Sequence, residues 1–374
     1  MKKYLNRNFS SPLLMNAFLL VLIGIIALYA SSAMKGSELY GDPFFFLKKQ
    51  VFAVIVGLAL VFLIKVLPFK FIERLVLPLL LISILLLFGI FIPGAYKTVG
   101  GASRWFNLGF AYIQPAELAK ISLVLFLAKN LSRESSDVTN FFSGILPNIL
   151  VLLVLSFLLM LQPDFGTTIL LFAVTLAMIF VAGSKVRFIA ISIFSSAAVA
   201  FLAIISEPYR LKRLVSFIDP WADFKAGGFQ IIQSYLAFQN GGLFGLGLGE
   251  SRQKLFFLPE AHTDFIFSVI GEEMGLFGTL IVCLLFYNLI STGFMIGQKT
   301  LDPFKKLLAF GMTCLIGFQT LFNLGVVMGT LPTKGISLPF ISSGVSSLLS
   351  YFFIISVLAR IGQEVPSIEE RRQE

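Results

Sequence analysis

The stretch LVLPLLLISILLLFGIFIPG, residues 75–94, contains no charged side chain. A helix of about 20 apolar residues crosses the hydrocarbon core of a bilayer, which is about 30 Å thick. Nine other stretches of the chain are similarly long and apolar. The sequence therefore predicts ten membrane-spanning helices, at residues 13–32, 50–67, 75–94, 113–130, 142–162, 166–183, 187–205, 264–296, 306–329 and 337–360.

The composition supports the same fold class. Of the 374 residues, 57% are hydrophobic and 13% are charged, whereas about 25% are charged in an average soluble domain. So few charges do not cover the surface of a water-soluble protein. We therefore expect an all-α polytopic membrane protein, with residues 1–374 forming one integral membrane domain. The single histidine excludes a metal site built on several histidines.

Basic residues are distributed unevenly among the predicted loops. Most Lys and Arg residues of the short loops fall on the side that also holds both termini. The positive-inside rule places that side in the cytoplasm, together with a tail at residues 361–374. The long loop at residues 207–263 then faces outward, where we expect it to fold back onto the helix ends. The net charge of +9 fits anionic lipids and diphosphate-bearing substrates better than nucleic acid.

Four polar groups interrupt the apolar pattern, and each is a functional hypothesis because ionisable residues at membrane depth are costly. The first is PEAHTDFIF at residues 259–267, where the long loop enters the eighth span. Thr263 or Asp264 lies at the expected N-cap of that helix, and capping alone would explain Asp264. A carboxylate there could also act as general base on a substrate hydroxyl. Small residues continue from it at helical spacing, which lets a neighbouring backbone or a ligand approach: Ser268, Gly271, Gly275 and Gly278.

The second group is QPAELAK at residues 114–120, in the weakest of the ten spans. Glu117 and Lys120 are three residues apart on one helical face, so they could form an internal ion pair that is either structural or involved in binding. Arg104, in the preceding outer loop, could hold a phosphate with its planar guanidinium. The third group, QPDFGTT at residues 162–168, is best explained as a turn between two spans.

The fourth group lies in the long loop and comprises residues 209–213, 219–221 and 253–254, which include Arg210, Arg213, Gln253 and Lys254. Clustered cations at the outer surface could attract lipid head groups, or they could stabilise a leaving diphosphate. The chain contains no GxSxG, HExxH or P-loop motif. These absences disfavour a serine hydrolase, a zinc protease and a nucleotide-driven enzyme.

In order along the chain, these motifs resemble the SEDS family (shape, elongation, division and sporulation). The resemblance covers most of the chain, and its specificity comes from the number and order of the motifs. They are GASRW (101–105), QPAELAK (114–120), QPDFGT (162–167), YR (209–210) with Arg213, DPW (219–221), the glycines of 241–249, QK (253–254), PEAHTDF (259–265), Asn323, Gly329 and LPTKGISLPFIS (331–342). Val345 departs from the family pattern, which has glycine there.

The resemblance implies ten transmembrane helices and a peptidoglycan glycosyltransferase that polymerises lipid II at the outer face of the cytoplasmic membrane. The residues of these motifs resemble the division branch of the family more than the elongation branch. A class B penicillin-binding protein and other membrane proteins of the division machinery are the implied partners. Two other functions stay open from the residues alone: a flippase for the lipid-linked precursor, and a non-catalytic scaffold.

The family pattern also implies roles for individual residues. Asp264 is the expected catalytic carboxylate. The residues expected to bind substrate are Arg104, Arg210, Arg213, Gln253, Lys254, His262 and Thr263. A divalent cation, Mg²⁺ or Mn²⁺, could assist the leaving diphosphate, although the sequence contains no recognisable protein metal site.

Overall fold

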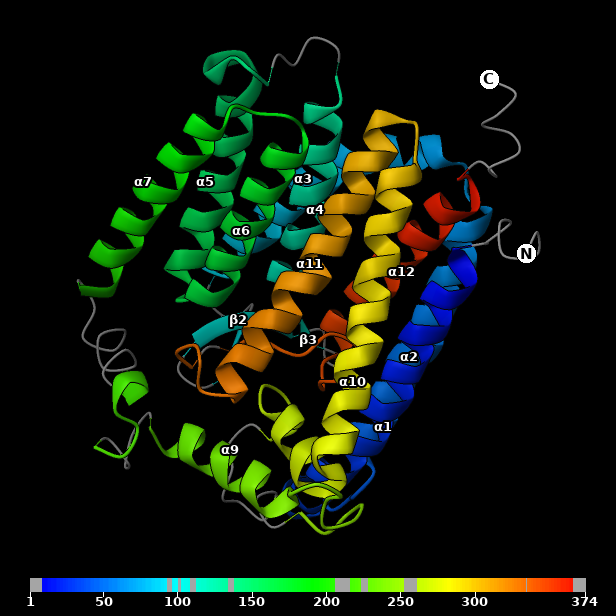
Figure 1. Cartoon of the computed structure of the whole chain (residues 1–374), viewed down its shortest axis with the longest axis vertical. Helices are drawn as coiled ribbons and strands as arrows, with labels where there is room; N and C mark the ends of the chain where they lie inside the picture. Colours follow the sequence, from blue (N-terminus) through cyan, green and yellow to red (C-terminus); the bar gives the residue numbers. More distant parts are fainter. Residues whose placement is uncertain are drawn as a thin grey trace.

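The computed structural model describes residues 9–92, 96–99, 102–107, 112–133, 138–205, 216–222, 228–251, 261–333 and 335–365. These residues form a bundle of helices with a small sheet at one end (Figure 1). A helix coincides with each predicted span, and a π-helical turn η2 (Phe141–Ile145) precedes the fifth. The ten helices are α1 (Ser10–Tyr40), α2 (Phe45–Val66), α3 (Phe69–Gly89), α4 (Pro115–Leu131), α5 (Leu146–Leu161), α6 (Phe165–Val181), α7 (Val186–Ile205), α10 (Ile266–Lys299), α11 (Pro303–Val327) and α12 (Val345–Gln363).

Length and hydropathy identify the chain as a membrane protein. Within the described residues, seven helices are long and apolar enough to cross a bilayer: α1, α2, α3, η2 with α5, α10, α11 and α12. Helix α6 is also apolar but has only 17 residues. Large apolar side chains cover the outside of the bundle, such as Leu85 and Phe88, which are 68% and 63% exposed. The expected multi-pass, helical fold class is therefore confirmed.

Helix α4 lies at the centre of the bundle, in contact with α3, α6, α11 and α12. Leu123, Val124 and Leu125 in its middle are completely buried. This position explains how a helix that carries Glu117 and Lys120 is tolerated in a membrane protein. Its two charges are surrounded by other helices instead of lipid.

Cationic side chains gather at the end of the bundle where α1 begins and α12 ends. Lys305 forms an ion pair of 2.6 Å with Glu364, and Arg360 lies 3.5 Å from the same carboxylate. Lys299 lies over the ring of Phe9, 4.4 Å from its centre. The sheet and α9 (Gly228–Gly241) lie at the opposite end (Figure 1).

The sheet between α3 and α4 was not expected from the sequence. Its strands are β1 (Tyr96–Val99), β2 (Ala102–Asn107) and β3 (Tyr112–Ile113), which pair antiparallel in the order β1-β2-β3. Strands this short are invisible to a criterion based on apolar spans of about 20 residues. The ring of Phe106 lies next to Gly89, so β2 is seated on the end of α3.

Two expected helix boundaries were wrong. The N-cap of α10 is Phe265, so neither Thr263 nor Asp264 caps that helix. Helix α12 begins only at Val345, and residues 337–344 of the tenth predicted span are irregular. Pro339 lies in this irregular segment, where its missing N–H group leaves no helical bond unmade. Val345 itself is half-buried in the first turn of α12, which accommodates its branched side chain.

Helix α9, in the long loop, packs against α10. The Ser234 hydroxyl lies 2.7 Å from that of Ser268 and donates to the Val327 carbonyl at 2.6 Å. The backbone of Gly241 lies against the carbonyl of Gly271. The small residues of α10 therefore receive a neighbouring backbone, which is one of the two uses expected for them.

The glycine-rich loop after α9 forms hydrogen bonds with α10 at a break in that helix. The backbone of Gly275 leaves helical geometry, with φ 64° and ψ −161°. Two loop amides, of Leu246 and Gly247, donate to the carbonyls of Glu272 and Glu273 at 3.0 and 3.1 Å. A side chain on Gly275 would be strained at this φ and would overlap the loop backbone. Glycine is therefore required where α10 opens to accept the loop.

Replacing Gly241 with alanine tests the docking of α9. The new Cβ would overlap the carbonyl oxygen of Gly271, so we expect a destabilisation of about 1–3 kcal/mol, typical of overpacking. Gly317→Ala in α11 is the matched control, because its nearest neighbours would lie at 3.8 Å. Thermal unfolding in detergent measures both. Equal melting temperatures for the two variants would contradict this packing.

Candidate functional site

A polar cavity of about 170 Å³ is bordered by strand β2 of the sheet. Its walls come from β2, α4, α6, α11, the turn before α10, the segment before α12 and the first turn of α12. The structure therefore brings together residues that are distant in sequence. The lining residues are Arg104, Trp105, Gln114, Glu117, Lys120, Thr167, Leu170, Thr263, Asp264, Gln319, Gly335, Ile336, Ser337, Ser343, Gly344 and Ser347.

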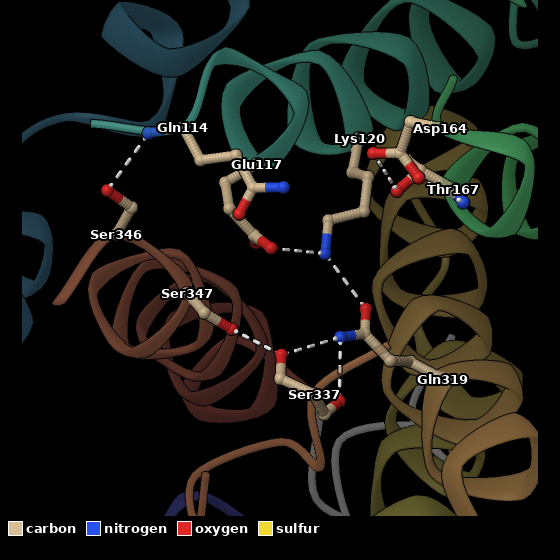
Figure 2. Close-up of polar contacts among 9 residues, drawn as sticks. All are labelled: Gln114, Glu117, Lys120, Asp164, Thr167, Gln319, Ser337, Ser346 and Ser347. Atoms are coloured by element: carbon tan, nitrogen blue, oxygen red, sulfur yellow. Dashed lines mark hydrogen bonds and ion pairs between the residues drawn. The ribbon is translucent and has the colours of Figure 1, made fainter. Parts of the chain in front are cut away.

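A chain of polar contacts borders the cavity on the side of α4 (Figure 2). Lys120 Nζ lies 2.9 Å from Glu117 Oε1 and donates to Gln319 Oε1 at 2.8 Å. Gln319 Nε2 donates to the Ser337 carbonyl at 3.0 Å, and the hydroxyls of Ser337 and Ser347 are 3.2 Å apart. The predicted contact between Glu117 and Lys120 is therefore present. These polar contacts connect α4, α11, the irregular segment before α12 and α12 itself.

The ion pair of Glu117 and Lys120 affects the stability of the protein because both side chains are buried. Glu117 and Lys120 are only 6% and 5% exposed, and removing two charges from water costs several kcal/mol per ion before their attraction is counted. The second carboxylate oxygen, Glu117 Oε2, has no hydrogen-bond partner among the described residues. Such an oxygen beside a polar cavity fits hydrogen bonding to water or to a polar ligand there.

Asp264 and Arg104 lie close to each other across Gly335. Asp264 Oδ2 is 3.5 Å from the position that a Cβ on Gly335 would take, and Arg104 Nη1 is 3.8 Å from the same position. A carboxylate and a guanidinium thus border the same small space, which the missing side chain of Gly335 leaves open. This arrangement can take a proton from one group of a ligand and stabilise negative charge on another.

The turn between α5 and α6 holds Arg104 in place. Arg104 Nε donates to the Gln162 carbonyl at 3.0 Å, and Nη2 donates to the Pro163 carbonyl. Asp164 caps α6, accepting bonds from the amide and the hydroxyl of Thr167 at 3.2 and 2.9 Å. The structural interpretation of the third motif therefore holds for Asp164. The same turn supplies the carbonyls that orient Arg104.

Of the other residues predicted to bind substrate, one lines the cavity and one is buried away from its lining. Thr263 lines the cavity beside Asp264. His262 is buried, with its ring 5.0 Å from that of Phe46, and it is not among the residues that line the cavity. The remaining four predicted binding residues lie outside the described residues: Arg210, Arg213, Gln253 and Lys254.

Several cavity residues were missed by sequence reasoning. Gln319 was overlooked although a polar side chain within an apolar span is itself a signal. Gly335 and Ser337 belong to a quoted motif, but no role followed from it. Their part in the site depends on the irregular path of the chain before α12, which the apolar pattern had assigned to a helix.

The described residues do not by themselves form a metal site. No group of three or more His, Cys, Asp or Glu side chains with suitable spacing occurs among them. The cavity carboxylates are Asp264 and Glu117, and Glu117 is paired with Lys120.

Comparison with known proteins places the chain in a family. A family model described as "Cell cycle protein", which covers FtsW, RodA and SpoVE, matches residues 11–366. The chain belongs to this family, the SEDS family, as its motifs indicated. It is 39% identical over 349 residues to a Geobacter metallireducens protein named probable peptidoglycan glycosyltransferase FtsW, with 93% of both chains covered. An Escherichia coli protein of the same name is 44% identical over 361 residues, covering 95% of this chain and 86% of the relative.

Solved structures show the same fold. A chain from a structure titled "Structural coordination of polymerization and crosslinking by a peptidoglycan synthase complex" superposes with a TM-score of 0.78 at 29% identity, covering 94% of this chain and 97% of the other. The rod shape determining protein RodA of Thermus thermophilus gives a TM-score of 0.70 at 27% identity, with 94% and 96% covered. The fold is thus that of solved SEDS proteins.

Removing the Glu117 carboxylate tests the energetic role of the buried pair. Glu117→Ala leaves the Lys120 ammonium without its ionic partner, and we expect a loss of about 3–5 kcal/mol in stability. The double variant Glu117→Leu/Lys120→Met removes both charges, so it should be more stable than Glu117→Ala alone. Denaturation in detergent measures the three proteins. A double variant that is less stable than the single one would show that the pair is not the source of the effect.

Proposed function

We propose that this chain is a peptidoglycan glycosyltransferase that polymerises lipid II during cell division. The names of its relatives support the activity and the division role. The observation that carries the proposal for the site is the facing pair of Asp264 and Arg104 at Gly335, on the wall of a polar cavity. A scaffold has no need of such a cavity.

The reaction assigns different work to the two charged groups. The acceptor hydroxyl attacks the anomeric carbon of the donor sugar, and Asp264 takes the hydroxyl proton as the new C–O bond forms. The bond from that carbon to the diphosphate breaks, and the lipid diphosphate leaves with the electron pair. Arg104 stabilises the negative charge of the leaving group. An α-linked donor that gives a β-linked glycan reacts by one inverting displacement, so no second carboxylate nucleophile is needed.

The proposed orientation puts this cavity on the outer side of the cytoplasmic membrane. Ten membrane-spanning helices with both termini inside would place the cationic end of the bundle, with Lys299, Lys305 and Arg360, in the cytoplasm. The sheet and α9 then face outward, where lipid II is polymerised. Arg210, Arg213, Gln253 and Lys254 are proposed to bind substrate there, together with Thr263.

A crosslinking enzyme is the proposed partner. The likeness to a chain of a peptidoglycan synthase complex that polymerises and crosslinks supports this proposal. We propose that the partner is a class B penicillin-binding protein, within a larger set of division proteins in the membrane.

Polymerisation of labelled lipid II tests the function. The wild type, purified with its penicillin-binding partner, should produce glycan chains. Asp264→Asn should lower the rate by about 10²–10⁴-fold, because general base catalysis is lost. Asp42→Asn is the matched control, since Asp42 is partly exposed, forms an ion pair of 2.7 Å with Lys48 and does not line the cavity. If the wild type made no glycan but moved lipid II across the membrane, the proposed enzyme activity would be wrong and a flippase function would take its place.

Gly335→Ala tests whether the space between Asp264 and Arg104 holds the reacting groups. The added methyl group would lie at ordinary contact distance from both side chains, 3.5 and 3.8 Å, so the protein should fold normally. We expect at least a tenfold loss of polymerisation, because a displacement of about 1 Å at a reacting centre can cost about 100-fold. Wild-type polymerisation by Gly335→Ala, measured beside Gly317→Ala, would place the reaction elsewhere.

A further inference from the structure

Asp264 belongs to a short turn that precedes helix α10. Helix α10 begins at Ile266, and the amide of Ser268 donates to the carbonyl of Phe265. The carbonyl of Asp264 therefore lies outside α10, one residue before its N-cap. A hydrogen-bond donor stabilises a partly buried carbonyl of this kind, because a backbone group that is removed from water without a partner costs free energy comparable to a lost hydrogen bond.

Asn323, near the C-terminal end of α11, supplies such a donor. Its side-chain amide donates to the Asp264 carbonyl at 2.8 Å and also to the Ile336 carbonyl at 2.7 Å. Asn323 is only 1% exposed, and its own Oδ1 has no partner among the described residues. The two N–H groups of one amide therefore connect the turn that carries Asp264 to the residue after Gly335.

Two neighbouring carbonyls are held in the same way by the segment before α12. The Ser342 hydroxyl donates to the Thr263 carbonyl at 2.6 Å and accepts a bond from the Leu338 amide at 2.7 Å. The Ser343 amide donates to the His262 carbonyl at 3.0 Å. Three successive carbonyls, of residues 262–264, are thus bound by donors from α11 and from the segment before α12.

We infer that Asn323 is a positioning residue for Asp264: by binding the Asp264 and Ile336 carbonyls with one amide, it sets the carboxylate against the Gly335 wall and Arg104. This inference rests on the proposed glycosyltransferase function. Asn323 touches no reacting atom, since both of its hydrogen bonds go to backbone carbonyls. Its contribution is the geometry of the general base, and small displacements of such a group are costly to the rate.

Asn323→Leu removes both donors while keeping a side chain of similar size. In the polymerisation assay with the penicillin-binding partner, we expect kcat to fall about 100-fold, with KM within about twofold of wild type because the binding residues are unchanged. Thr320→Val is the matched control. Thr320 lies three residues earlier on α11, is 3% exposed, and its hydroxyl has no hydrogen-bond partner among the described residues. This variant should polymerise at the wild-type rate.

The number of lipid II binding sites per protein separates positioning from a general loss of folding. Fluorescent lipid II titrated onto Asn323→Leu in nanodiscs should bind with wild-type stoichiometry. The lower kcat would then belong to protein that is folded and binds substrate. Binding sites lost in proportion to activity would make Asn323 merely structural and overturn the inference. Wild-type kcat in Asn323→Leu would overturn it as well.

Ser342→Ala provides a second test if Asn323→Leu does not fold. This variant removes the hydroxyl that donates to the Thr263 carbonyl, in the same turn as Asp264. It should lower kcat about tenfold with unchanged binding stoichiometry. An unchanged kcat would contradict the positioning role of these hydrogen bonds. A wild type that makes no glycan, in contrast, would refute the proposed function itself. The two failures are therefore distinguishable.

Discussion

The Lys120 ammonium is the constraint around which this bundle is arranged. A charge at this depth must be surrounded by protein groups, and Glu117 and Gln319 supply them at 2.9 and 2.8 Å. The helix that carries the charge therefore lies in the centre, enclosed by α3, α6, α11 and α12. Its neighbours in turn expose apolar faces to lipid. One buried cation thus determines which helix is central and which side of the cavity is polar.

The second constraint is the bonding of irregular backbone at the end of the bundle that carries the sheet. The turn before α10 and the segment before α12 leave helical geometry, so their carbonyls and amides need partners from elsewhere in the protein. Asn323, Ser342 and the amide of Ser343 provide them. Because these two segments bond to each other, they form a defined wall of the cavity. Asp264 can then be both outside a helix and fixed in position.

Hydropathy predicted the helices well because an apolar span reports directly on lipid contact. It could not locate the start of α12, since residues 337–344 are apolar enough to extend a span but bond to the turn before α10. It also missed the sheet, whose strands are too short for the span criterion. The family motifs selected Asp264 and Arg104, yet their approach at Gly335 depends on contacts between residues more than 70 positions apart. No local pattern carries that information. The same holds for Asn323, whose partner Asp264 is 59 residues away.

The central claim is that Asp264 and Arg104 act on one substrate in the cavity beside Gly335. A structure of the Asp264→Asn variant with its penicillin-binding partner and lipid II tests this claim most directly. We expect the diphosphate within hydrogen-bond reach of Arg104 and an acceptor hydroxyl about 3 Å from the side chain of residue 264. A lipid II head group bound at a different surface, with the cavity occupied only by water, would contradict it.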